Sequence, residues 1–289
     1  YLAEDAAAEL FAPGRRPVIA GQGTRPCQAV QADGGFLLTG AWSFASGIKH
    51  ATHIHTLAVI EETGEPRIFV LPVEQATLID NWDVLGLRAT GSIDYTIDSV
   101  FVPEGYTHFA TTEAPVTGGW IYTMGIPGFA SICHTGWALG VGRRLLDELA
   151  GLVQAKAGRP GAQAESDSFL EAFADTEGTY RAARAFAHET WNDLQDALER
   201  GDPLSVRQHT LMRLAITHVT WAVHEVGVFV YRASGTTALR SGAVQRIYRD
   251  LHAGTQHMIV SPPVRRTIGR ELAGLASGKK WRFMELVDA

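Results

Sequence analysis

The feature that most constrains the fold is a change of hydrophobic periodicity along the chain. Residues 16–106 contain short runs in which apolar and polar side chains alternate, without the sustained repeat of about 3.6 residues that marks a helix. Such alternation is typical of strands with one buried face. From residue 128 onwards the chain contains long runs with helical spacing instead, interrupted where Pro and Gly occur.

These patterns predict an α+β protein in which a small, mostly antiparallel β-domain precedes a C-terminal four-helix bundle. We expect the β-domain at residues 16–110, a connector rich in Gly and Thr at residues 111–127, and the bundle at residues 128–289. Residues 1–15 are interpreted as the remnant of a preceding helical domain, because an Ala-rich helical run stops there at a Pro-Gly pair.

The four helices are expected at about residues 128–156, 167–199 and 204–233, and from residue 241 through the stretch that carries His252 and His257. The first of them contains Gly-x-x-x-Gly at residues 136–140, a spacing of small residues that we expect to admit a second backbone closely.

Composition excludes several classes of function. The formal net charge of −6 and the pI near 6.0 do not provide the positive surface that nucleic acid or an anionic membrane attracts. No apolar run approaches about 18 residues without a charge, so no membrane partner is expected. Cys27 and Cys133 lie far apart in the sequence, which favours a reducing, cytoplasmic setting over a disulfide framework.

A first candidate site lies at residues 40–47, which read Gly-Ala-Trp-Ser-Phe-Ala-Ser-Gly. In an extended strand Trp42, Phe44 and Ser46 share one face, so two aromatic rings and a hydroxyl line a common surface. The plainer interpretation is that both rings belong to the core. Ser46 fits that interpretation less well, because a buried hydroxyl needs a hydrogen-bond partner.

A second candidate site lies in the late helix. Asp250 and His257 are seven residues apart and therefore share a helix face, and Arg246, Arg249 and Asp250 have the spacing of intrahelical ion pairs. A helix histidine is more often a packing residue than a catalyst. His53 and His55 share a strand face, but no third ligand follows at a suitable spacing, so no metal site is predicted.

Taken together, these segments resemble the acyl-CoA dehydrogenase fold and, within it, the two-component flavin-dependent monooxygenases, such as the hydroxyphenylacetate, steroid phenol and dibenzothiophene oxygenases. The resemblance covers nearly the whole chain. The matching segments are residues 35–47, residues 82–92, the strand end Ser-Val-Phe-Val-Pro at residues 99–103, and Arg-Ile-Tyr-Arg-Asp at residues 246–250 with His257 beyond.

The resemblance implies roles for particular residues. Ser46 corresponds to the hydroxyl at the flavin N5 edge, and His257 to the histidine that faces the flavin C4a region and the substrate. These two are the expected catalytic residues. The expected cofactor-binding residues are Trp42, Phe44, Ser46, Trp82, Thr90 and Ser92.

The resemblance also implies the chemistry and the partners. Reduced FMN or FAD, supplied by a separate flavin reductase, reacts with O2 to a C4a-hydroperoxyflavin that hydroxylates a small aromatic substrate or N-oxidises an amine. Such chemistry needs a site from which water is excluded. A homotetramer packed through the bundles is expected.

Two departures from the fold's common pattern leave alternatives open. Acyl-CoA dehydrogenases carry a catalytic glutamate immediately before a late Gly-Thr pair, whereas Ala253 stands at that position here. This favours the oxygenase over a dehydrogenase with a displaced base. The family also begins with a helical domain that covers the flavin, and the chain starts where that domain is expected to end, so a catalytically silent truncated homologue is the other alternative.

Overall fold

The chain forms two compact units. The computed structural model describes residues 1–289, apart from the side chains of residues 23–25. Unit 1 consists of residues 1–84 and 88–126, and unit 2 consists of residues 85–87 and 127–289. The short segment 85–87 therefore packs with the second unit, although the residues on both sides of it pack with the first.

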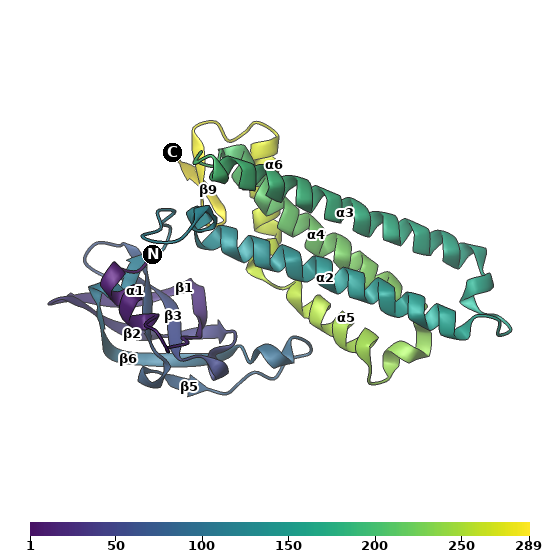
Figure 1. Cartoon of the computed structure of the whole chain (residues 1–289), viewed down its shortest axis with the longest axis horizontal. Helices are drawn as coiled ribbons and strands as arrows, with labels where there is room; N and C mark the ends of the chain where they lie inside the picture. Colours follow the sequence, from purple (N-terminus) through teal and green to yellow (C-terminus); the bar gives the residue numbers. More distant parts are fainter. The chain divides into compact units, whose positions relative to one another are not determined.

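Unit 1 is built on one sheet with the strand order β5-β6-β2-β1-β3-β4-β7 (Figure 1). Neighbouring strands are antiparallel, except that β1 and β3 are parallel. A short helix precedes the sheet. The elements are α1 (Glu4–Leu10), β1 (Ile19–Ala32), β2 (Gly35–Ala45), β3 (His53–Ile60), β4 (Pro66–Pro72), β5 (Thr77–Ile79), β6 (Ile93–Pro103) and β7 (Thr107–Phe109).

The core of unit 1 is centred on two aromatic side chains of neighbouring strands. The rings of Trp42 and Tyr95 stack with centroids 5.3 Å apart, and both are fully buried. Each satisfies its polar atom: Trp42 Nε1 donates to the Leu57 carbonyl at 2.9 Å, and the Tyr95 hydroxyl donates to Thr56 Oγ1 at 2.7 Å. Buried Trp and Tyr need such partners, which also fix the rings in place.

Unit 2 is a bundle of long helices followed by a hairpin. In Figure 1, α2, α3 and α4 run side by side. The elements are α2 (Gly125–Lys156), α3 (Asp167–Glu199), α4 (Val206–Ala233), α5 (Ala243–Gly254), α6 (Pro262–Leu272), β8 (Lys279–Arg282) and β9 (Glu285–Asp288). The predicted α+β class, a mainly antiparallel β region followed by a helical bundle, is confirmed.

Local sequence explains where these helices begin and end. Ser205 and Gln208 form a reciprocal capping box at the start of α4, and Ser166 accepts from the Phe169 amide at the start of α3. The last predicted helix is shorter than expected. It stops at Gly254, and a separate helix, α6, starts with Pro262 and Pro263 in its first turn.

The close contacts between helices occur at other glycines than expected. A Cβ added to Gly142 would lie 2.9 Å from a methyl group of Val223 on α4, and one added to Gly227 would lie 2.7 Å from Leu251 on α5. At Gly136 and Gly140 an added Cβ meets nothing within 4 Å in the described part of the chain. The prediction that residues 136–140 admit a second backbone is therefore wrong within this unit.

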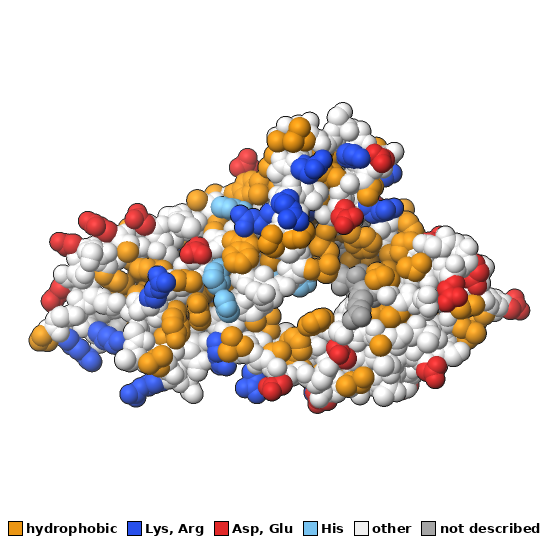
Figure 2. Space-filling view, turned by 180° about the vertical axis from the view of Figure 1, so that it is seen from behind, with side chains coloured by type: hydrophobic (Ala, Val, Ile, Leu, Met, Phe, Trp, Pro, Cys, Tyr) orange, Lys and Arg blue, Asp and Glu red, His pale blue; other side chains and the backbone are white. Residues whose placement is uncertain are grey.

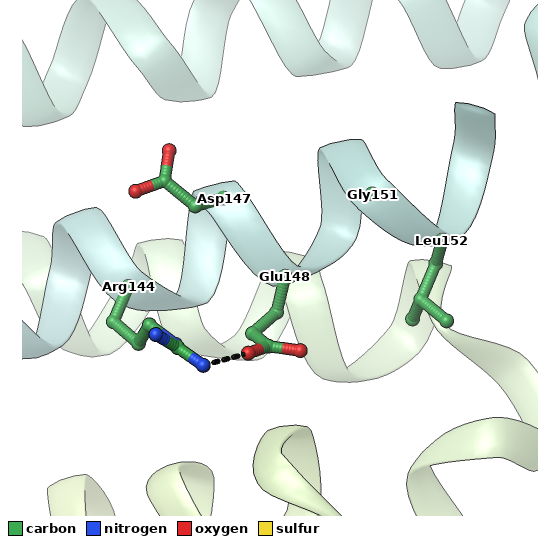
Figure 3. Close-up of a pocket in the computed structure, with 5 residues that line it drawn as sticks. All are labelled: Arg144, Asp147, Glu148, Gly151 and Leu152. Carbon is green, nitrogen blue, oxygen red and sulfur yellow. Dashed lines mark ion pairs between the residues drawn. The ribbon is translucent and has the colours of Figure 1, made fainter. Parts of the chain in front are cut away.

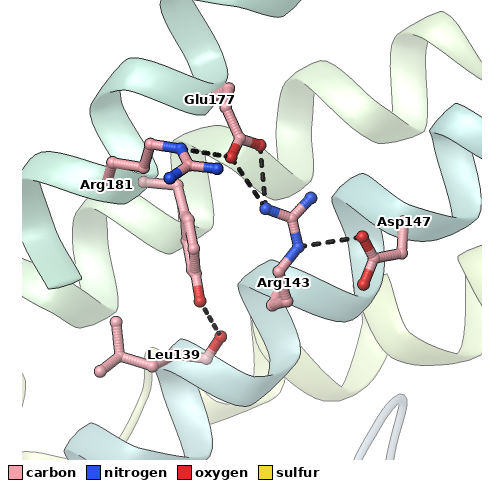
Figure 4. A network of polar contacts seen from close by, with 6 residues as sticks. Leu139, Arg143, Asp147, Glu177 and Arg181 are labelled. Carbon is pink, nitrogen blue, oxygen red and sulfur yellow. Dashed lines mark hydrogen bonds and ion pairs between the residues drawn. The ribbon is translucent and has the colours of Figure 1, made fainter.

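An ionic network ties α2 to α3 (Figure 4). Arg143 Nη1 donates to Glu177 at 2.9 Å, and its guanidinium group lies 5.3 Å from the ring centroid of Tyr180. The Tyr180 hydroxyl donates to the Leu139 carbonyl at 3.2 Å. Glu177 also pairs with Arg181 one turn along α3 at 2.7 Å. The network is partly buried, so solvent screens it less than an exposed pair.

One helix of the bundle, α4, is long and apolar enough to cross a membrane by length and composition. Half of its most apolar window is buried, and four of its buried side chains belong to the bundle core: Val219, Val223, Val226 and Val230. We therefore describe it as a core helix. On the side of the molecule drawn in Figure 2, acidic and basic side chains are scattered among apolar ones.

Candidate functional site: a hydroxyl cluster and a histidine pair

Three hydroxyl groups that the sequence singled out meet in unit 1. Ser46 Oγ and Ser92 Oγ lie 2.6 Å apart, and Thr90 Oγ1 lies 2.7 Å from Ser92 Oγ. The Gly47 amide donates to the Thr90 carbonyl at 2.8 Å and so holds the two segments together. Ser92 is buried in the middle of this row, whereas Ser46 is exposed at its end. We call the three side chains the hydroxyl cluster.

A bulge at the end of β2 determines which side chains accompany the cluster. The pairing of β2 with β6 shifts register between Trp42 and Ala45, and Phe44 has a φ of +66°. The extra residue reverses the alternation, as bulges do. Ala45 consequently faces the core, while Phe44 is 69% exposed. The prediction that Trp42 shares a face with Phe44 and Ser46 is wrong, because Trp42 is 1% exposed and lies in the core of unit 1.

An aromatic pair comes from the same two segments of sequence as the hydroxyl cluster. The rings of Phe44 and Trp82 meet edge to face with centroids 6.1 Å apart. An exposed ring next to an exposed hydroxyl suits a planar heteroaromatic group, because the ring offers apolar surface while the hydroxyl bonds to atoms on the planar group's edge. The residues present therefore fit a flavin.

His257 belongs to unit 2 and does not lie on a helix, contrary to the prediction. It follows the end of α5, and its Nδ1 accepts from the Ile259 amide at 3.3 Å, capping the short turn Met258–Val260. The residue is exposed, yet desolvation of its ring lowers the pKa of His257 below the ordinary value. The neutral imidazole is therefore favoured near pH 7.

The ring of His257 lies against a second imidazole, that of His134 on α2. The two centroids are 5.3 Å apart, and His134 also meets Trp137 at 5.0 Å. Burial, together with the charge of His257, lowers the pKa of His134 to about 4. Among the described residues, His134 Nε2 is buried and has no hydrogen-bond partner. No local pattern around His134 marks it as a partner of His257, because the two residues lie on elements far apart in the chain.

Trp137 lies one turn after His134 on α2 and packs against the end of α5. A Cβ added to Gly254, the last residue of α5, would lie 2.2 Å from the Trp137 ring. Only glycine leaves room for the indole at this point. The packing of Trp137 against the end of α5 therefore depends on the glycine of the late Ala-Gly-Thr sequence.

The polar residues of α5 make other contacts than the predicted ion pairs. Asp250 Oδ1 accepts from the Leu87 amide at 2.6 Å, and Arg249 Nη1 donates to the Leu85 carbonyl at 3.1 Å. On the same helix His252 Nδ1 lies 3.0 Å from Nε2 of His224 on α4. Arg249 and Asp250 thus contact segment 85–87, which the expected ion pairs of this helix did not anticipate.

A shallow depression of about 350 Å³ is found elsewhere, along α2 (Figure 3). It is lined by Arg144, Asp147, Glu148, Gly151 and Leu152, with an ion pair of 2.6 Å between Arg144 and Glu148. None of the predicted site residues belongs to this lining. We assign it no part in the site.

Comparison with known proteins identifies the family. Residues 132–262 match the family model described as acyl-CoA dehydrogenase, C-terminal domain. The chain is 30% identical over 275 residues to an indole-3-acetate monooxygenase of Pseudomonas putida, a match that covers 92% of this chain and 70% of the relative. The chain belongs to the flavin-dependent monooxygenases of the acyl-CoA dehydrogenase fold. The family predicted from the sequence is confirmed.

Further relatives agree with this assignment. The oxygenase component of an FADH2-dependent resorcinol hydroxylase of a Rhizobium species is 27% identical over 94% of this chain and 72% of its own length. The crystal structure of a 3-HSA hydroxylase from a Rhodococcus species superposes with a TM-score of 0.89 at 23% identity, covering 98% of this chain and 76% of the other. The predictions of an oxidoreductase and of a reduced flavin cofactor are likewise confirmed.

Proposed function

We propose that this chain is the oxygenase component of a two-component flavin-dependent monooxygenase that inserts one oxygen atom of O2 into a small aromatic substrate. Reduced FMN or FAD, when bound, supplies the electrons that activate O2. A separate flavin reductase provides the reduced cofactor. The observation that carries the proposal is the hydroxyl cluster of Ser46, Thr90 and Ser92 with the exposed Phe44 ring beside it.

In this proposal the hydroxyl cluster holds the polar edge of the flavin. Ser46 is exposed and donates or accepts at that edge, while Ser92 and Thr90 fix the orientation of its hydroxyl through the hydrogen-bonded row. A hydroxyl that is already oriented loses little entropy on binding. Phe44 and Trp82 provide the apolar surface against the ring system.

His257 handles protons in this proposal. Its lowered pKa keeps the imidazole neutral near pH 7, so it is ready to take a proton from a phenol or an indole nitrogen. A positioned general base contributes typically about 100-fold to 10,000-fold to the rate. The neutral His134 ring beside it adds no positive charge that would lower the basicity of His257 further.

The proposed assembly is a homotetramer, and the proposed location is the cytoplasm. Both follow from the resemblance described above and from the use of cysteine in this chain. The mass of the particle in solution tests the first expectation: sedimentation should give four copies of the 31.3 kDa chain.

The test of the function combines the protein with FMN or FAD, a flavin reductase, NADH and a panel of phenols and indoles under ¹⁸O2. We expect a hydroxylated product that carries one ¹⁸O atom. Ser46→Ala should weaken flavin binding about 2-fold to 10-fold, as the loss of one neutral hydrogen bond implies. His257→Ala should bind flavin normally but release hydrogen peroxide in place of product.

The matched control is Ser43→Ala, a change of the same kind on the same strand. It should leave flavin affinity and product yield unaltered. The proposal is wrong if the protein binds neither flavin and forms no labelled product with any member of the panel. A normal product yield from His257→Ala would remove the role of that histidine alone.

A further inference from the structure

The segment Leu85–Gly86–Leu87 is held on α5 by two hydrogen bonds of opposite sense. The Asp250 carboxylate accepts from the Leu87 amide at 2.6 Å, and the Arg249 guanidinium group donates to the Leu85 carbonyl at 3.1 Å. Both bonds join a charged side chain to the backbone, and charge-assisted hydrogen bonds of this kind are shorter and stronger than neutral ones.

Glycine at position 86 allows the segment to lie directly on the helix backbone. A Cβ at this position would be 2.1 Å from the Arg249 carbonyl oxygen and 2.8 Å from the Asp250 amide nitrogen. Gly86 is buried. The neighbouring Leu87 has a φ of +56°. Residues other than glycine rarely adopt this backbone conformation, which persists only where the surroundings impose it. The Asp250 bond to its amide is one such constraint.

The segment lies in the chain between the residues that the proposed function assigns to the flavin. Trp82 precedes it by three residues, and Thr90 and Ser92 follow it by three and five. The residues on both sides of the segment belong to unit 1, whereas the segment itself packs with α5 in unit 2. A change in the conformation of Leu87 is therefore transmitted through five residues of backbone to Trp82 and through three to Thr90.

We propose that Asp250 is a positioning residue for the flavin site. It touches neither flavin nor substrate in this inference. It holds Leu87 in its left-handed conformation, and through it sets the path of residues 82–92 that carry Trp82, Thr90 and Ser92. The inference rests on the proposed function, because it assigns these three residues to the cofactor.

The test uses the full chain and two independent readouts. Hydrogen–deuterium exchange without flavin reports the order of peptide 82–92, and fluorescence titration reports the dissociation constant of FMN and of FAD. Asp250→Ala should speed exchange of that peptide and weaken flavin binding about tenfold, as the loss of a charge-assisted hydrogen bond implies. Asp250→Asn keeps an acceptor oxygen and should stay within about 2-fold to 3-fold of the wild type on the same principle.

A second disruption and a control separate positioning from folding. Gly86→Ala forces the segment off α5 while Asp250 remains, so it should also speed exchange of peptide 82–92 and weaken flavin binding. If Asp250→Ala does not fold, Gly86→Ala alone tests the inference. Arg246→Ala changes an exposed residue of the same helix and should alter neither readout.

Unchanged exchange of peptide 82–92 in Asp250→Ala, or in Gly86→Ala where that variant decides, would overturn the inference. So would faster exchange with unaltered flavin affinity, because the segment would then be anchored without serving the site. A wild-type chain that binds no flavin would contradict the proposed function itself, and exchange would still show whether Asp250 anchors the segment.

Discussion

At the scale of the residue, one backbone conformation decides what the end of β2 offers to a ligand. A positive φ at a residue other than glycine costs on the order of 1–3 kcal/mol and persists where packing imposes it. Phe44 meets that condition, because Trp42 before it and Ala45 after it are both buried. The bulge turns the Phe44 ring outwards while Ser46 remains at the Ser92 hydroxyl.

His134 makes the stability of the protein depend on pH. Its pKa is about 4 in the folded chain, mainly because of burial, whereas an unfolded histidine has its ordinary value of 6.5. Between these values the unfolded chain binds more protons, so the free energy of unfolding rises with pH. The full contribution is present above about pH 6.5 and is lost as the pH falls toward 4. Urea unfolding at several pH values should show this slope.

The variant His134→Gln removes the titrating group and keeps a side chain of similar size. We expect its free energy of unfolding to fall less steeply than that of the wild type between pH 6.5 and 4. His188→Gln, at an exposed position on α3, should retain the wild-type slope. Equal slopes in His134→Gln and the wild type would show that His134 is not desolvated in the folded chain.

At the scale of the element, α5 makes close contacts at two places along its length. One turn of the helix receives segment 85–87 at Arg249 and Asp250, and its last residue, Gly254, lies against the Trp137 ring of α2. The helix is only twelve residues long, and its conformation therefore depends more on these contacts than on intrinsic propensity.

Gly254→Ala should destabilise the bundle. The added Cβ would lie 2.2 Å from Trp137, and a rigid indole cannot give way without moving α2 or α5. Overpacking of this kind costs about 1–3 kcal/mol. Gly140→Ala on α2 is the control, since the added methyl meets open space and a helical alanine is favoured over glycine by about 0.5–1 kcal/mol. Chemical denaturation measures both, and equal stabilities of the two variants would contradict the packing argument.

At the scale of the whole molecule, the same fold supports dehydrogenation and oxygenation, so single positions decide between them. The dehydrogenase pattern needs a carboxylate before the late Gly-Thr pair to remove the α-proton of an acyl-CoA. Ala253, which stands at that position here, cannot accept a proton. The chain as a whole therefore carries the scaffold of the acyl-CoA enzymes without their base.

We therefore expect that flavin bound to this protein is not reduced by an acyl-CoA thioester under anaerobic conditions. The loss of a catalytic base lowers such rates by about 100-fold to 10,000-fold. Bleaching of the flavin absorbance after mixing with butyryl-, octanoyl- or palmitoyl-CoA measures the reaction. Rapid bleaching with any of them would mean that another residue supplies the base, whereas chemical reduction of the same sample serves as the positive control.

Much of the fold follows from the sequence because it depends on local patterns. Alternation over residues 16–106 predicted the strands, and the helical runs predicted α3 at its observed bounds and α2 and α4 to within a few residues. The candidate site was predicted through the resemblance, and Ser46, Thr90 and Ser92 do meet. Family membership and cofactor class were likewise available from motifs in their order along the chain.

The tertiary structure decided what no local pattern contains. A bulge buried Trp42 and exposed Phe44, since register depends on the pairing of β2 with β6. The His134 ring contacts that of His257 because α2 passes the end of α5. Asp250 accepts a hydrogen bond from the Leu87 amide and, among the residues that the structure describes, does not form the expected ion pair with a neighbouring arginine. The sequence alone determined which elements form and which chemistry they can carry. Packing decided which side chains meet, because contacts between distant segments depend on geometry that neither segment encodes by itself.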